Sequence, residues 1–110
     1  MSVTKLLAKL TRKDQNIMNK SQVITAWQSG RIARTPNGSL TSSSDGTLYS
    51  YNLPIGATID GELIVGDFTA SGTFYSMTTS HHVSNARSVA RSVSVAEFES
   101  AYKADKWYRA

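Results

Sequence analysis

The stretch Gly46-Thr47-Leu48-Tyr49-Ser50-Tyr51 returns later in the chain as Gly72-Thr73-Phe74-Tyr75-Ser76-Met77. Each copy reads Gly, Thr, large apolar, Tyr, Ser, large apolar. A turn glycine followed by β-branched and aromatic residues that alternate with small polar ones is typical of a strand. The repetition therefore predicts two strands, over residues 47–52 and 73–77, that pair at the centre of a small antiparallel sheet.

The residues before this sheet carry helical patterns. Apolar side chains at positions i, i+3, i+4 and i+7 predict a first helix, with its stripe on Val3, Leu6, Leu7 and Leu10. A second helix is expected over residues 22–29, capped by Ser21 and ended by Gly30 in the left-handed conformation. Trp27 continues the apolar face of this helix, so we expect it to anchor the core.

The residues after the second copy also predict helices. Thr79 or Ser80 is expected to cap a third helix that runs to about Val93. The sequence Ser94-Val95-Ala96-Glu97 matches a capping box and predicts the start of a last helix. The expected fold is one α+β domain over residues 1–110, with a basic helical part at 1–34, an antiparallel sheet of three or four strands at 35–78, and C-terminal helices at 79–110.

The charges are distributed unevenly along this plan. The net charge of the chain is +4. Residues 1–34 hold seven Lys and Arg against one Asp, whereas residues 35–78 hold four acidic residues and no Lys or Arg. A polyanionic partner is therefore expected to meet the helices rather than the sheet.

Nucleic acid is the partner that this charge distribution favours. The candidate phosphate contacts are basic residues of the two helical parts, namely Lys9, Arg12, Lys13, Arg87 and Arg91. Arg87 and Arg91 are four positions apart, so on a helix they would lie on one side and clamp an anion. The alternative for this pair is an ordinary solvated helix face.

The two repeat copies carry large side chains that define a second candidate surface. If the copies pair as strands, Tyr49, Tyr51, Tyr75 and Met77 form a ridge on one face of the sheet. Such a ridge is either a platform on which nucleic-acid bases stack or the core face beneath the helices. Residues 35–78 offer no cation to a phosphate backbone, so the sequence favours the core.

The sequence offers little support for catalysis or metal binding. The chain has no cysteine, and its only histidines, His81 and His82, point about 100° apart on a helix. No nucleophile turn, phosphate loop or dinucleotide fingerprint is present. We therefore predict a protein without enzymatic activity, metal or cofactor. The apolar runs are too short to span a membrane, and we expect a cytoplasmic protein.

Two segments resemble a known group of proteins. Residues 48–56, Leu-Tyr-Ser-Tyr-Asn-Leu-Pro-Ile-Gly, and residues 74–83, Phe-Tyr-Ser-Met-Thr-Thr-Ser-His-His-Val, are similar to the LYSYN…IA and YSMTTSxHV segments of small proteins encoded by tailed phages. The resemblance covers roughly residues 45–85 and supplies no catalytic or binding residues. It implies a phage accessory protein that acts in the bacterial cytoplasm.

Two functions follow as hypotheses from these observations. The basic helical parts favour a small nucleic-acid-binding protein, whose affinity falls steeply with salt. The resemblance to phage proteins suggests the alternative, a protein-binding inhibitor of a host defence system or a host enzyme. The sequence favours nucleic acid by a small margin.

Overall fold

The computed structural model describes residues 19–109. The predicted first helix and the candidate residues Lys9, Arg12 and Lys13 lie outside this part of the chain. In order, the elements are α2 (Lys20–Gln28), β1 (Ala33–Arg34), β2 (Leu40–Ser42), β3 (Thr47–Ser50), β4 (Leu53–Ile59), β5 (Glu62–Gly66), α3 (Met77–Ala86), β6 (Arg91–Val93) and α4 (Val95–Arg109).

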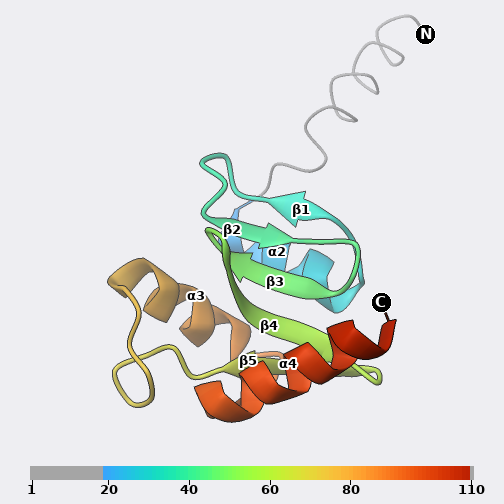
Figure 1. Cartoon of the computed structure of the whole chain (residues 1–110). Coiled ribbons are helices and arrows are strands. Elements are labelled where there is room, and N and C mark those ends of the chain that lie inside the picture. The colour runs from blue at the N-terminus through green and yellow to red at the C-terminus, as the bar shows by residue number, and fades with distance from the viewer. Residues whose placement is uncertain (1–18, 110) are drawn as a thin grey trace, which may run out of the picture.

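The strands form one six-stranded sheet in which neighbours in space are neighbours in sequence (Figure 1). β1 to β5 pair antiparallel, and β6 pairs with β5 in parallel after the crossover through α3. The expected α+β class is confirmed. The sheet has six strands with one parallel pair, however, rather than three or four antiparallel strands.

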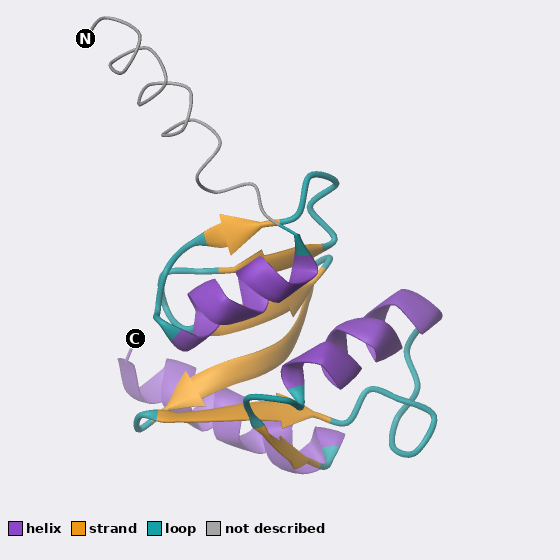
Figure 2. Ribbon diagram, turned by 180° about the vertical axis from the view of Figure 1, so that it is seen from behind, coloured by secondary structure: helices purple, strands orange, loops and turns teal. Residues whose placement is uncertain are grey.

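Helices cover both faces of the sheet. Seen from behind, α2 and α3 lie in front of the sheet and α4 lies on the far side (Figure 2). α2 contacts β1 to β3, and α4 contacts β4 and β5. Because both faces are covered, Ile55, Gly56 and Ala57 of β4 are buried in succession without the alternation of a one-sided sheet.

Trp27 of α2 is the largest side chain in the core, as predicted. It is fully buried, and its indole Nε1 donates a hydrogen bond of 2.8 Å to the carbonyl of Gly46. Its ring lies directly on Gly56, where a Cβ atom would approach Cζ2 of the indole to 2.9 Å. On the other face, Phe98 of α4 packs edge-on against Phe68 with the ring centroids 6.2 Å apart.

α2 begins two residues earlier and ends one residue earlier than the predicted helix over residues 22–29. Asn19, not Ser21, caps the helix: its side chain accepts from the backbone of Gln22, while the Gln22 side chain accepts from the backbone of Asn19. This reciprocal pair is a capping box. Gly30 follows the helix at φ 72°, in the left-handed conformation that was expected.

The predicted pairing of the two repeat copies is wrong. The first copy forms β3, which pairs with β2 and β4. The second copy is an irregular segment that becomes helical at Met77. The position next to β5 is already taken by β6, and Asp67 closes the intervening loop by accepting hydrogen bonds from the hydroxyls of Thr69 and Ser71. The same residue types therefore adopt different structures in different tertiary surroundings.

The predicted third helix also differs from the structure. It begins earlier than predicted, because Ser76 rather than Thr79 or Ser80 caps it by accepting from the amide of Thr79 at 3.1 Å, and it ends at Ala86. Arg91–Val93 then form β6 instead of a last helical turn. The start of α4 is as expected, with Ser94 Oγ accepting from the amide of Glu97 at 3.1 Å. None of the helices within residues 19–109 is long and apolar enough to cross a bilayer.

Candidate functional site

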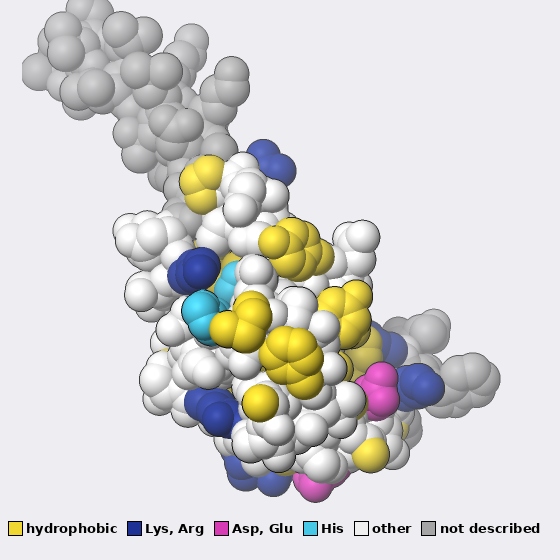
Figure 3. Space-filling view, turned by 90° about the vertical axis from the view of Figure 1, so that its left-hand side faces the viewer, with side chains coloured by type: hydrophobic (Ala, Val, Ile, Leu, Met, Phe, Trp, Pro, Cys, Tyr) yellow, Lys and Arg dark blue, Asp and Glu magenta, His cyan; other side chains and the backbone are white. Residues whose placement is uncertain are grey.

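Four large apolar side chains are exposed at one end of the molecule. Tyr51, Phe74, Tyr75 and Met77 are exposed to 52%, 51%, 61% and 65%, and we call them the apolar patch. They come from the β3–β4 turn, the loop before α3 and the first residue of α3. In Figure 3, which faces this end, hydrophobic side chains gather on the surface. The interpretation of Tyr51, Tyr75 and Met77 as core is therefore wrong.

The two repeat copies still meet, although not as paired strands. Ser50, at the end of the first copy, places its Oγ 2.8 Å from Oγ1 of Thr79. Ser76, in the second copy, accepts from the amide of the same Thr79. Each serine precedes a patch residue, Tyr51 and Met77 respectively. The shared contact with Thr79 thus brings the exposed ends of both copies to one surface.

Tyr51 has an unusual backbone conformation for an aromatic residue. It lies in the two-residue turn between β3 and β4 at φ 55°, a left-handed conformation that favours glycine. Its amide is held by the carbonyl of Ser39 at 2.8 Å. The expected alternation with Tyr49 fails here because the chain leaves the strand at Ser50. Tyr49 instead turns its hydroxyl toward α4, while Tyr51 projects outward.

Replacing Tyr51 by glycine separates stability from surface function. Because the tyrosine is half exposed and its backbone is strained, we expect Tyr51→Gly to leave the free energy of unfolding unchanged or raise it by up to about 1 kcal/mol. Urea denaturation followed by circular dichroism measures this change. A loss of more than about 1 kcal/mol would show that Tyr51 is a packing residue. Asp60, at φ 53° before Gly61 in the β4–β5 turn, is the comparison site, since Asp tolerates this conformation.

Directly beneath the patch lies a buried polar cluster. Oγ of Ser50 is 2.8 Å from Nδ1 of His82, and both side chains are fully buried. Nε2 of His82 is buried without a hydrogen-bond partner. Burial lowers the pKa of His82 from 6.5 to about 4, helped by the positive charges of Lys20 and His81. His82 is therefore neutral at physiological pH, and the Ser50–His82 pair is closed to a substrate.

The surroundings of the patch carry almost no charge. Residues 46–59 and 68–86, which supply the patch and its supporting elements, contain no Lys, Arg, Asp or Glu. Lys20 at the start of α2 is close enough for its charge to lower the pKa of His82. Within the described residues, the patch is thus an apolar surface with aromatic groups and hydroxyls, without the cluster of cations that phosphate binding requires.

The two described candidates for phosphate binding, Arg87 and Arg91, do not form a clamp. Arg87 follows the end of α3 and contacts Asp67 at 2.6 Å. Arg91 lies in β6, where Nε and a terminal nitrogen bind Glu62 at 3.0 and 3.2 Å. Each guanidinium thus already has a carboxylate partner. The predicted shared helix face is wrong because the helix ends at Ala86.

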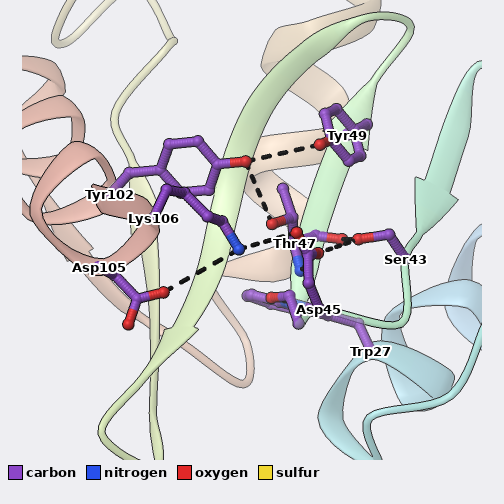
Figure 4. A network of polar contacts seen from close by, with 9 residues as sticks. Trp27, Ser43, Asp45, Thr47, Tyr49, Tyr102, Asp105 and Lys106 are labelled. Atoms are coloured by element: carbon purple, nitrogen blue, oxygen red, sulfur yellow. Dashed lines mark hydrogen bonds and ion pairs between the residues drawn. The ribbon is translucent and has the colours of Figure 1, made fainter. Parts of the chain in front are cut away.

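A second polar cluster lies on the opposite face, between α4 and the β2–β3 turn (Figure 4). Lys106 Nζ binds Asp45 at 2.8 Å and lies 5.1 Å from the ring centre of Tyr102. The Tyr102 hydroxyl is 3.3 Å from that of Thr47 and 3.5 Å from that of Tyr49. Figure 4 shows these groups pointing toward one another, so that they connect α4 to the β2–β3 turn.

The protonation states within this second polar cluster suit a structural role. Burial alone would raise the pKa of Asp45, but hydrogen bonds from Lys106, Ser43 and Thr47 outweigh it, and the pKa lies well below its usual value. The hydrogen bond with Tyr102, followed by burial, raises the pKa of Tyr49 to about 12. Asp45 is thus a stable anion and Tyr49 a stable phenol near neutral pH. Neither is poised to transfer a proton.

Across residues 19–109, no three His, Asp or Glu side chains converge to hold a metal ion. Comparison of the chain with protein-family models, with curated proteins and with solved structures finds no match. The apolar patch is the surface feature that calls for an explanation.

Sequence reasoning named three of its members but assigned them to the core, and it missed Phe74, whose position in an expected strand pointed it to the opposite face.

Proposed function

We propose that this chain is a non-enzymatic protein-binding accessory protein that docks on its partner through the apolar patch. The observation that carries the proposal is the exposure of Tyr51, Phe74, Tyr75 and Met77 at one end of the molecule, whereas most other large apolar side chains of the described residues are buried. Contiguous exposed apolar surface marks interaction sites, and Tyr, Phe and Met are enriched at protein interfaces.

The conformation of the turn supports the proposal. A tyrosine at φ 55° costs conformational free energy that the fold does not recover by burying the side chain. Backbone strain of this kind is concentrated at functional sites. Two χ angles make Tyr51 a rigid aromatic anchor, which limits the entropy lost on binding.

The resemblance to small phage proteins suggests the class of partner. Because the resemblance implies a phage accessory protein, the partner we propose is a bacterial host protein that this chain inhibits by occupying its surface. The segments that supply the patch, residues 46–59 and 68–86, contain no Lys, Arg, Asp or Glu, which favours a partner with a complementary apolar surface.

Nucleic-acid binding is the second candidate, favoured by the excess of basic residues in positions 1–34. It is the weaker one, because Arg87 and Arg91 are paired with carboxylates. Its contacts would be Lys9, Arg12 and Lys13. Each phosphate contact contributes about 0.9 to the salt slope on duplex DNA, so this interpretation requires a steep loss of affinity with salt.

The proposal predicts selective loss of capture from a bacterial lysate. Tagged wild-type chain is incubated with a nuclease-treated lysate, and bound proteins are quantified by mass spectrometry against the double variant Tyr75→Ser/Met77→Ser. We expect one host protein to be retained by the wild type and reduced at least tenfold by the variant, since aromatic anchors at interface centres contribute about 2 kcal/mol or more.

Ile32→Ser is the matched control for this experiment. Ile32 is also an exposed large apolar residue, at 55%, but it lies away from the patch. Ile32 follows Arg31, whose carbonyl accepts a hydrogen bond from the Ser42 hydroxyl at the end of β2. The Tyr51 amide donates instead to the carbonyl of Ser39, which precedes the start of β2. Ile32 and Tyr51 therefore lie near opposite ends of this strand. Equal loss of capture in both variants would contradict the proposal. Capture that disappears with nuclease and weakens with salt would favour nucleic acid.

A further inference from the structure

The described chain begins at the same end of the molecule as the apolar patch. The start of α2, the β3–β4 turn and the start of α3 lie on one side in both ribbon views (Figures 1 and 2). α2 packs against α3, and the charge of Lys20 reaches His82 beneath the patch. Whatever precedes Asn19 is therefore attached beside the patch.

The preceding segment has the composition of a ligand for such a surface. Residues 1–18 lie outside the described part, and their sequence places Val3, Leu6, Leu7 and Leu10 at the spacing of one helical stripe, with Lys and Arg between and after them. Apolar helix faces bind to apolar surfaces through residues at i, i+3, i+4 and i+7. The nine residues from Thr11 to Asn19 span up to roughly 30 Å when extended, which is ample to reach a neighbouring surface.

We infer that the stripe of Val3, Leu6, Leu7 and Leu10 docks on the apolar patch of its own chain and competes there with the partner. The inference rests on the proposed function in that the patch is the docking surface. A tethered segment acts at a high effective concentration, so even a weak contact occupies the patch until a tighter partner displaces it.

Paramagnetic relaxation in the full chain tests this contact. The chain has no cysteine, so Ala8→Cys offers a single site for a nitroxide label. On a helix Ala8 lies opposite the stripe, where a label does not block docking. We expect the amide signals of residues 51 and 74–77 to lose most of their intensity, while those of residues 60–62, at the β4–β5 turn, keep theirs.

Two further samples decide the outcome. In the labelled chain that also carries Leu6→Ser and Leu7→Ser, the signals of residues 51 and 74–77 should recover, and this chain should capture more host protein than the wild type. Mixing label-bearing chains with isotope-labelled chains that lack the nitroxide should leave the signals unchanged. Unselective broadening, no broadening, or broadening only in the mixture would overturn the inference. Loss of capture in Tyr75→Ser/Met77→Ser is measured separately, so failure of this contact is distinguishable from failure of the proposed function.

Discussion

Replacing Trp27 by alanine is expected to lower the free energy of unfolding by about 4 kcal/mol. Trp27 is fully buried, lies on Gly56, and joins α2 to the β2–β3 turn through its hydrogen bond to Gly46. Truncating a buried Trp to Ala removes apolar contact and leaves a cavity, which together cost roughly 3–5 kcal/mol. Since small domains are stable by only about 5–15 kcal/mol, the variant should be close to unfolding.

Trp27→Phe provides the comparison. Phenylalanine keeps most of the apolar contact but removes the indole donor to the Gly46 carbonyl, so a loss of about 1–3 kcal/mol is expected. Denaturant unfolding followed by far-ultraviolet circular dichroism measures both variants without relying on tryptophan fluorescence. A loss below about 1 kcal/mol for Trp27→Ala would show that α2 does not anchor the core.

The second large effect is a loss of stability in mild acid through His82. In the unfolded chain a histidine takes up a proton as the pH falls below 6.5, whereas burial holds the pKa of folded His82 at about 4. Unfolding therefore takes up a proton between these values, and stability decreases as the pH falls through this window. One pKa unit corresponds to about 1.4 kcal/mol, so the full loss from pH 7 to pH 4 is about 3 kcal/mol.

Neighbouring His81 supplies the matched control, because it is exposed on the same helix. His81→Gln removes the smallest of the contributions that lower the pKa of His82, so it should keep most of the wild-type dependence between pH 6.5 and 4. His82→Asn, which retains a polar atom near Ser50, should flatten it even if its stability at pH 7 is lower. Hydrogen bonds lower the pKa values of Asp45 and Asp67. Protonation of these two carboxylates at more acidic pH therefore lowers the stability of all variants alike. Equal pH dependence in wild type and His82→Asn would contradict the burial of His82.

Local chemistry predicted several elements of this fold. The α+β class, the burial of Trp27, the left-handed Gly30 and the Ser94 cap of α4 were predictable because each depends on neighbouring residues. The structure of the second repeat copy was not predictable in this way. Its strand-like residues follow a loop closed by Asp67, and β6 arrives from a distant part of the chain to pair with β5. Such non-local pairing overrides the local preference.

The candidate site was predictable only in part, for the same reason. Repetition drew attention to Tyr51, Tyr75 and Met77, but their exposure depends on a left-handed turn at Tyr51 and on the early start of α3. Tyrosine carries no signal for that turn, because glycine is the residue expected there. The prediction placed Arg87 and Arg91 on one helix face because it extended the third helix beyond Ala86. Their ion pairs with Asp67 and Glu62 join distant parts of the chain, which no spacing rule predicts.

The most direct test of the apolar patch is the affinity of the purified host partner for single-surface variants. Titration calorimetry with the captured protein compares the wild type, Tyr51→Gly, Tyr75→Ser/Met77→Ser and Ile32→Ser at constant salt. We expect the dissociation constant to rise at least tenfold for Tyr51→Gly and for the double variant, with folding intact, and to change less than twofold for Ile32→Ser. Unchanged affinity in Tyr51→Gly and the double variant would show that the partner binds elsewhere and that the patch is not the docking surface.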